Sequence, residues 1–365
     1  MVNGIRSRAW QQSLTGETIG LDLSDRQGTY VVLDDAGEVR SEGKVAMTRR
    51  GLERSFGVRQ PARIAIEVGT HSVWVDRELR RLGHEVIVAN PRAVPLISRS
   101  KKKNDREDAQ TLARLARLDP KLLRPIQHRG PQAQADLAVL RSRDLLVRAR
   151  SAMINHVRGA VKADGARINK CSADAFAAKA KAQLPQTLQA ALLPLLQTIA
   201  LMTQQLKDYK AQLEKLAAEH YPETTVLRRV KGVGLLTSLG FVLVLEEWQR
   251  FSNSRSVGAF VGLTTRQYQS GQSQPQLRIT KAGDALLRRL LVQSANYVLG
   301  PFGPDSDLRR WGLKLAGTGD NQIRKHKAII AVARKLACLL HHLWATGEIY
   351  EPLYLEAQLQ AVVVA

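Results

Sequence analysis

Nine apolar residues in the middle of the chain recur at alternating intervals of four and three, and this spacing limits the possible folds more than any other feature. The interval is that of the a and d positions of a heptad repeat, so it predicts a long helix with a coiled-coil seam. Pro194 should kink or begin the regular part, which we expect to span Leu195 to Leu216. A basic amphipathic pattern over residues 132–161 predicts a preceding long helix, paired either as an antiparallel hairpin or between protomers. The repeat positions are Leu188, Leu192, Leu195, Ile199, Met202, Leu206, Tyr209, Leu213 and Leu216.

Ahead of these helices, residues 17–89 have the pattern of a mixed sheet combined with helices. Runs rich in β-branched residues alternate with amphipathic stretches, and Asp34–Gly37 is typical of a hairpin turn. Asn104 is placed to cap a further helix that ends near Leu118. Three antiparallel strands followed by strand–helix alternation is the order of an RNase H-like (RuvC-like) fold. The predicted strands are 18–23, 29–33, 37–45, 63–68 and 85–89, and the predicted helices are 48–58 and 71–82.

The chain is strongly basic, and the charge is uneven. Lys and Arg total 55 and Asp and Glu 33, a net charge of +22 over 365 residues. Residues 226–335 carry 18 basic and 6 acidic side chains, a net of +12. A surplus of this size indicates a polyanionic partner such as nucleic acid. The patterns together predict an α/β plus α organisation: a leader (1–16), a RuvC-like domain (17–130), coiled-coil helices (131–220), a mainly helical C-terminal domain (221–350) and a tail (351–365).

Membrane and secreted proteins fit the sequence poorly. No run approaches the roughly 18 consecutive apolar residues of a spanning helix, and residues 1–15 lack the apolar core of a secretory signal. Cys171 and Cys338 match no metal-ligand spacing, so we expect two small buried hydrophobes in a reducing compartment. The sequence therefore predicts a protein of the cytoplasm with no membrane partner.

Four acidic residues fall where a sheet would gather them: Asp22 in the first strand, Glu67 at the end of a later strand, and Asp105 with Asp108 on one face of a helix. Each acid alone is more simply an ordinary strand-end or helix-start residue. Their joint occurrence in this element order favours a site for Mg²⁺, or Mn²⁺, suited to phosphodiester chemistry.

Two glycines flank one apolar residue in Val230-Lys231-Gly232-Val233-Gly234, between two apolar helical patterns. This is the arrangement of a helix-hairpin-helix, whose backbone N–H groups bind phosphates without reading sequence. A plain helix-connecting turn has the same pattern, but Arg228, Arg229 and Lys231 beside it favour the phosphate-binding interpretation. The run Lys101, Lys102 and Lys103 predicts a second basic loop.

Ser270 precedes Gly271 in a loop-like stretch ahead of another basic segment. Such a serine can approach a phosphate closely, and Arg266, Arg278 and Lys281 would bind the phosphate charge. By composition alone Ser270 is simply a loop serine. His341 and His342 lie in a predicted amphipathic helix, residues 327–345, where packing is the simpler explanation than metal binding.

These motifs, taken in order, resemble the insertion-sequence transposases with an N-terminal RuvC-like DEDD domain, the IS110 and IS1111 groups. The resemblance covers nearly the whole chain. It rests on Ile19-Gly-Leu-Asp22-Leu-Ser, Ile66-Glu67-Val-Gly, Val88-Ala-Asn-Pro91, Lys103-Asn-Asp105-Arg-Glu-Asp108-Ala, Val230-Lys-Gly-Val-Gly234, Trp248-Gln-Arg-Phe251, Val261-Gly-Leu263, Gln269-Ser270-Gly271 and Arg278-Ile-Thr-Lys-Ala-Gly283-Asp284.

The resemblance implies a prokaryotic, nucleoid-associated DNA recombinase that works as a homo-tetramer and is guided by a structured non-coding RNA pairing with donor and target DNA. It implies that Asp22, Glu67, Asp105 and Asp108 hold magnesium, and that Ser270 attacks the scissile phosphate to form a phosphoserine. Its composite site would combine the RuvC-like domain of one protomer with the C-terminal domain of another.

Two other functions fit the residues. One is a RuvC-like nuclease that cleaves DNA junctions by hydrolysis, with water as nucleophile and Ser270 idle. The other is a non-enzymatic nucleic-acid-binding assembly protein, for which the charge and the coiled coil would suffice. A covalent protein–DNA adduct separates the first of these from the transposase, and loss of function in Asp22→Asn with unchanged folding argues against the second.

Overall fold

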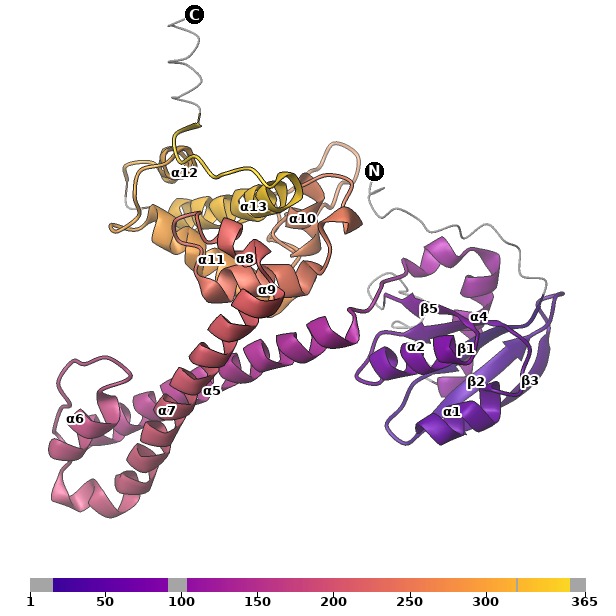
Figure 1. Ribbon diagram of the computed structural model, residues 1–365, viewed down its shortest axis with the longest axis horizontal. Coiled ribbons are helices and arrows are strands. Elements are labelled where there is room, and N and C mark those ends of the chain that lie inside the picture. Colours follow the sequence, from indigo (N-terminus) through magenta and orange to yellow (C-terminus); the bar gives the residue numbers. More distant parts are fainter. Residues whose placement is uncertain (1–15, 91–103, 320, 355–365) are drawn as a thin grey trace, which may run out of the picture. The chain divides into compact units, whose positions relative to one another are not determined.

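The computed structural model describes residues 16–90, 104–319 and 321–354, which form two compact units divided between His128 and Arg129 (Figure 1). The first is called the N-terminal unit and the second the C-terminal unit.

The N-terminal unit is built on a five-stranded mixed sheet in the order β3-β2-β1-β4-β5. The first three strands are antiparallel, β4 pairs in parallel with β1, and β5 pairs in parallel with β4. This arrangement fits the predicted RNase H-like fold. Asp34 accepts hydrogen bonds from the N–H groups of Ala36 and Glu38, which confirms the predicted hairpin turn. The strands are β1 (Thr18–Asp22), β2 (Gln27–Leu33), β3 (Val39–Ala46), β4 (Arg63–Glu67) and β5 (Glu85–Ala89).

Helices cover both faces of this sheet. One face packs α1 (Arg49–Phe56) and α2 (Ser72–Arg81) into the larger apolar core of the unit. The other packs α4 (Asp105–Leu118), followed by a 3₁₀ turn at Pro120–Leu123. Asn104 accepts a hydrogen bond from the Arg106 N–H and so caps α4 as predicted.

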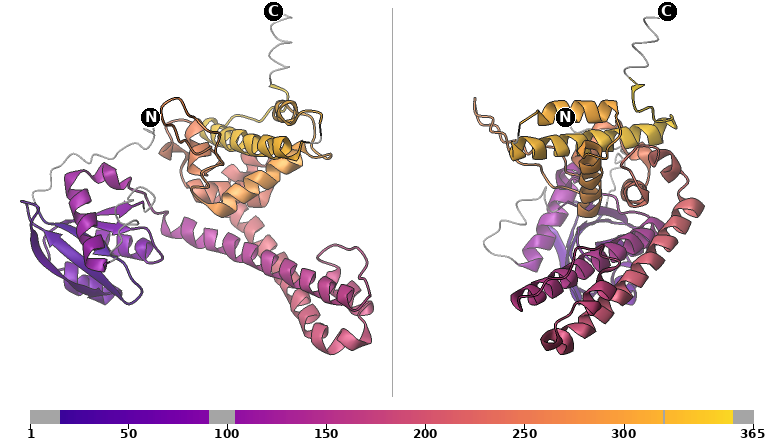
Figure 2. Two further views of the ribbon diagram at one scale, coloured as in Figure 1. Left: turned by 180° about the vertical axis from the view of Figure 1, so that it is seen from behind. Right: turned by 90° about the vertical axis from the view of Figure 1, so that its left-hand side faces the viewer.

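Two long helices open the C-terminal unit and pair with each other within one chain. They are α5 (Pro131–Ala163) and α7 (Gln189–His220). Between them lie a loop and the short α6 (Phe176–Ala182), which share a small apolar core with the adjoining ends of both long helices (Figure 2). A 3₁₀ turn at Gln186–Leu188 leads into α7, and Pro194 lies within its first two turns.

The seam of α7 differs from the heptad prediction. The a positions are buried as expected, but the other buried residues lie four residues after an a position. The predicted d positions are only partly buried. Because α7 packs against other segments as well as α5, positions outside the heptad seam are buried too. Leu196 packs into the small core beside α6, Thr203 accepts a hydrogen bond from Arg150, and Ala217 packs against the helices that follow α7. The buried a positions are Leu192, Ile199, Leu206 and Leu213, the additional buried ones are Leu196, Thr203 and Ala217, and the displaced d positions are Leu195, Met202, Tyr209 and Leu216.

The remaining helices form one large apolar core, and both long helices are rooted in it. Ala133, Leu137 and Leu140 of α5 and Leu213 and Ala217 of α7 belong to this core. The other helices are α8 (Glu223–Leu227), α9 (Leu235–Leu245), a 3₁₀ turn at Trp248–Arg250, α10 (Arg255–Phe260), α11 (Ala285–Leu299), α12 (Asp307–Ala316) and α13 (Gln322–Thr346).

By length and apolar composition alone, α13 would be able to cross a membrane. It instead packs against α11 and α12 as part of the core. His341 is buried on α13, with Nδ1 2.9 Å from Ser254 Oγ and Nε2 3.0 Å from the Trp248 carbonyl. The predicted packing role of His341 is therefore confirmed. Cys171 and Cys338 form no disulfide with each other, and both are only partly buried, unlike the prediction; Cys171 packs against the edge of the small core beside α6.

Candidate active site

Asp22 and Glu67 end adjacent parallel strands. Leu21 pairs with Ile66 in the β1–β4 register, so the two acids occupy the next position along both strands. Side chains alternate between faces along a strand, and Gly20 and Ala65, two residues earlier, both face α4. The carboxylates of Asp22 and Glu67 therefore lie on the α4 side of the sheet, at its carboxyl edge.

The first turn of α4 lies over the same edge. A Cβ on Gly20 would come within 1.8 Å of the Ala109 carbonyl oxygen, so only glycine admits the helix at this distance. At the other end of α4, the Ala116 carbonyl accepts a hydrogen bond from Arg63 at the start of β4. Asp108, next to Ala109, is only 6% exposed. The fold thus brings three of the four predicted acids to one edge, and Asp105 lies one helical turn further out, exposed.

This edge offers the oxygen ligands that Mg²⁺ prefers. Among the described residues, however, no three His, Cys, Asp or Glu side chains are already gathered as a metal-binding group. These acids therefore fit a divalent cation by the chemistry of their oxygen atoms and by the positions of their backbone.

His71 and Asp25 form a pair at this edge that the sequence alone does not predict. His71, the residue before α2, lies 3.5 Å from the exposed carboxylate of Asp25 in the β1–β2 turn. The indole N–H of Trp74 donates to His71 Nδ1 over 3.0 Å and orients the ring. The pair links the two loops that follow β1 and β4, a relation with no local sequence signal.

Ser270 lies in the C-terminal unit at the tip of an irregular β-hairpin. Its N–H donates to the Ser273 carbonyl and the reciprocal bond closes a two-residue turn. Gly271 takes the first turn position with φ of +55°, which glycine adopts without strain. Ser270 itself is exposed. Lower in the hairpin the Arg266 N–H donates to the Arg278 carbonyl, so these predicted phosphate ligands face each other across the two strands.

The base of this hairpin is tightly held. Arg288 of α11 donates through Nη1 to the carbonyls of Val261 and Ala282, which lie on the two sides of the base. Gly262 and Gly283 both have positive φ, and a Cβ on either would lie within 2.3 Å of backbone on the opposite side. None of these anchoring residues was predicted, since their roles depend on contacts between segments distant in sequence.

Asp284 extends the anchor to α5. It caps α11 by accepting from the Leu287 N–H, and it pairs with Arg141 at 2.7 Å. Burial opposes ionisation of this carboxyl, but the hydrogen bonds from Leu287 and Arg141 outweigh it and hold its pKa below the usual value. Asp284 is therefore an anion under neutral conditions and fixes the helix that carries Arg288.

The glycine-rich turn connects α8 to α9. Gly232 has φ of +92°, and a Cβ there would press on Tyr297 and Ser294 of α11. Gly234 precedes the first turn of α9, is exposed and would have open space around a Cβ. Gly232 thus has a packing role, while Gly234 leaves a helix N-terminus accessible to an anion.

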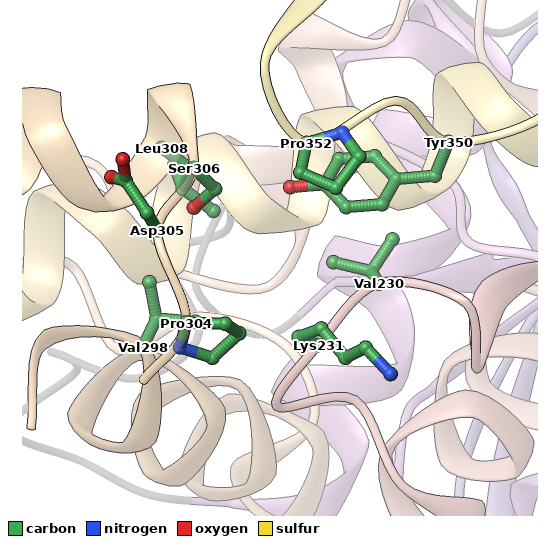
Figure 3. Close-up of a pocket in the computed structure, with 9 residues that line it drawn as sticks. All are labelled: Val230, Lys231, Val298, Pro304, Asp305, Ser306, Leu308, Tyr350 and Pro352. Atoms are coloured by element: carbon green, nitrogen blue, oxygen red, sulfur yellow. The ribbon is translucent and has the colours of Figure 1, made fainter. Parts of the chain in front are cut away.

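Lys231, within this turn, is exposed and borders a small pocket between the turn and the segments around α12 and Pro352 (Figure 3). Arg228 pairs with Glu214 of α7 at 3.0 Å, which partly neutralises it. The other predicted cations among the described residues are exposed: Arg229, Lys231, Arg266, Arg278 and Lys281. Lys101, Lys102 and Lys103 lie outside the described residues.

Two protein families match this chain, one over residues of both units and one within the C-terminal unit. Residues 19–163 match a DEDD transposase family of the IS110 type, and residues 224–307 match a family described as transposase IS116/IS110/IS902. The first match suggests dependence on a divalent metal and the second implies a DNA substrate.

Curated relatives extend the match to nearly the full chain. A probable family 20 transposase of Pseudomonas aeruginosa is 30% identical over 92% of this chain and 98% of its own length. The transposase for insertion sequence element IS1111A of Coxiella burnetii is 29% identical over 84% of this chain and 85% of its own. The transposase for IS1328 of Yersinia enterocolitica is 27% identical over 80% and 86%. With the matching sheet and helical units, this similarity makes the chain a DNA transposase that belongs to the IS110 family of insertion sequences.

Proposed function

We propose that this transposase cuts and rejoins DNA through a covalent serine intermediate, with Ser270 as nucleophile and the acidic edge of the sheet assisting. The observation that carries the proposal is the Ser270 hairpin, which exposes a hydroxyl at the tip of a tight turn, has Arg266 and Arg278 across its strands, and is fixed at its base by Arg288. A serine in an ordinary surface loop would need neither the flanking arginines nor the base anchored by Arg288.

The proposed step conserves atoms and bonds. Ser270 Oγ attacks the scissile phosphorus, the bond to the 3′-oxygen breaks, the serine proton passes to solvent, and the departing oxygen takes up a proton. The product is a 5′-phosphoserine and a free 3′-hydroxyl. Attack by a 3′-hydroxyl of another strand reverses the step and rejoins DNA. The cations Arg266, Arg278 and Lys281 would stabilise charge on the phosphate oxygens.

Asp22, Glu67, Asp105 and Asp108 would hold Mg²⁺ or Mn²⁺, which when bound neutralises charge at the scissile phosphate and the leaving oxygen. The burial of Asp108 beside the sheet supports this assignment, because a carboxylate so placed keeps a fixed position for its ligand. Asp105 would complete the set from the exposed end of the same helical face.

We further propose that a non-coding guide RNA pairs with donor and target DNA, and that the chain acts as a homo-tetramer on nucleoid DNA. The net charge of +12 over residues 226–335 and the exposed cations Arg229, Lys231 and Arg266 support contacts to phosphate backbones. Pairing by an RNA would supply the sequence specificity that such contacts lack.

A second candidate is hydrolytic junction cleavage by the N-terminal unit alone. Its support is that the acids converge on an edge of the sheet without any contribution from Ser270. The third hypothesis, a non-enzymatic nucleic-acid-binding assembly protein, is rejected because the chain belongs to a family of transposases.

A reconstituted cleavage assay tests the proposal. The purified protein is mixed with Mg²⁺, DNA containing the ends of its insertion sequence, and RNA transcribed from the flanking sequence. We expect strand cleavage that needs the RNA and stops with EDTA. Cleavage that is unchanged without RNA would remove the guide from the mechanism, and cleavage unchanged by EDTA would remove the metal.

A further inference from the structure

The far ends of α5 and α7 carry a small structure with its own core, which we call the head: residues 158–184, comprising the last turns of α5, the following loop and α6. Its core is formed by residues from all of these parts and from the start of α7. The buried side chains within the head are Val161, Ile168, Phe176, Ala180 and Leu184.

Two inward-facing arginines hold the head loop in place. Arg150 of α5 is 9% exposed and donates through Nη1 to Asp174 of the loop at 2.7 Å and to Thr203 of α7 at 3.0 Å. Arg158 lies over the ring of Phe176 at 5.0 Å and donates to the Ile168 carbonyl. The loop is therefore a fixed surface, because guanidinium groups crosslink it to both long helices.

Unpaired cations outnumber acids on the outer surface of the head. Of its two acids, Asp174 is paired with Arg150, while Asp164 accepts a hydrogen bond from the hydroxyl of Thr187 and keeps its charge. Five exposed cations have no side-chain hydrogen bond or ion pair within the described ranges. They are Lys162, Arg167, Lys170, Lys179 and Lys181.

The head is also distant from the large apolar core into which the other ends of α5 and α7 pack. On α5 the residues of that core end at Leu140, and the head begins at Arg158. At about 1.5 Å per residue, the intervening helix separates them by roughly 25–30 Å. A duplex bound near the Gly234 turn or the Ser270 hairpin has to extend at least this far to reach the head, so the two sites cannot share one phosphate.

We propose that the head is a separate binding site for the phosphodiester backbone of a nucleic-acid duplex, held by Lys162, Arg167, Lys170, Lys179 and Lys181. It reads no sequence, because its donors are long, flexible cationic side chains that contact phosphates. Five exposed cations spread over the end of α5, the loop and α6, on a structure held in place by Arg150 and Arg158, suit an extended polyanion better than a small anion.

The test compares two triple variants of the full-length protein in a Ser270→Ala background. One removes Lys170, Lys179 and Lys181 of the head by substitution with Gln. The matched control, called the stem variant, replaces with Gln three exposed lysines of α7 that lie outside the head: Lys207, Lys210 and Lys215. Binding to a DNA duplex and to an RNA duplex of about 40 base pairs is measured by fluorescence anisotropy from low to high salt, and thermal melting checks the fold.

Each phosphate that the protein ceases to neutralise reduces the slope of log K against log salt by about 0.9 on DNA. We expect the slope of the head variant to fall by about 1 to 3 units on at least one duplex, and that of the stem variant to fall clearly less although its net charge is the same. The duplex that responds identifies the ligand as DNA or RNA. Equal slopes for the two variants on both duplexes would overturn the proposal. If the head variant melts early, Lys162→Gln with Arg167→Gln gives the same comparison outside α6.

Discussion

The acidic edge and the Ser270 hairpin hold their functional groups by different means. Asp22, Glu67 and Asp108 are placed by regular elements packed on both faces of a sheet, and their positions follow from strand register and helix docking. Ser270 stands at the exposed end of a hairpin that is anchored at its base by Arg288 and two glycines, with one further hydrogen bond from Lys327 to Gln276. The proposed metal ligand set would need constant geometry, whereas the proposed nucleophile, which would leave one strand for another, would benefit from a support that can move.

Loss of an acid from the rigid edge should have the largest effect. We expect Asp22→Asn to reduce strand cleavage by about 10²–10³-fold, the range found when one charge-stabilising group is removed from an active site. Glu38→Gln is the control, because Glu38 is an exposed acid between β2 and β3, at the opposite end of β1, and should matter little. Similar losses in the two variants, with both melting like wild type, would contradict the assignment of Asp22.

A change in the helix docking should come next. Gly20→Ala puts a methyl group into the Ala109 carbonyl, so it should lower the thermal stability of the N-terminal unit by about 1–3 kcal/mol or more and displace Asp108. Gly69→Ala, where a Cβ meets nothing within 4 Å, should leave the melting temperature nearly unchanged. Full activity in Gly20→Ala would show that the edge tolerates movement of α4.

The hairpin anchor should matter less and in a different way. Arg288→Ala removes two hydrogen bonds from the base, and we expect about a tenfold lower rate of strand cleavage with unchanged DNA affinity. Arg288→Lys should restore part of the rate, because an ammonium can still donate to one carbonyl. Arg289→Ala, on the same helix but paired with Asp144, is the control. Loss of affinity in place of rate would mean that Arg288 binds DNA and does not position the hairpin.

The smallest effect concerns pH. The folded pKa of Asp284 is depressed, so its stabilisation is complete above the unfolded pKa near 4 and is lost as the pH falls through the folded pKa. Arg141→Gln weakens the depression of this pKa, so the variant should melt a few degrees below wild type at pH 7, and the difference should shrink as the pH falls below about 4. A difference in melting temperature that does not shrink as the pH falls would show that Arg141 acts by packing.

The two sites also differ in how far the sequence predicts them. The strands, the Asn104 cap and the carboxyl-edge position of Asp22 and Glu67 follow from local patterns of burial and hydrogen bonding. The a positions of α7 are buried as predicted, but the d positions are only partly buried. The heptad rule assumes a supercoiled pair of helices, whereas α7 also packs against α6 and α9. Arg288, Asp284 and the His71–Asp25 pair act through partners distant in sequence, and nothing local identifies them.

A covalent adduct is the most direct test of the central claim that Ser270 is the nucleophile. The protein is expressed with its native flanking DNA, and SDS-stable protein–DNA adducts are compared among wild type, Ser270→Ala and Ser273→Ala, its partner across the same turn. We predict an adduct in wild type and Ser273→Ala that is absent in Ser270→Ala. An adduct that persists in Ser270→Ala, or DNA cleavage by wild type with no adduct, would contradict the account.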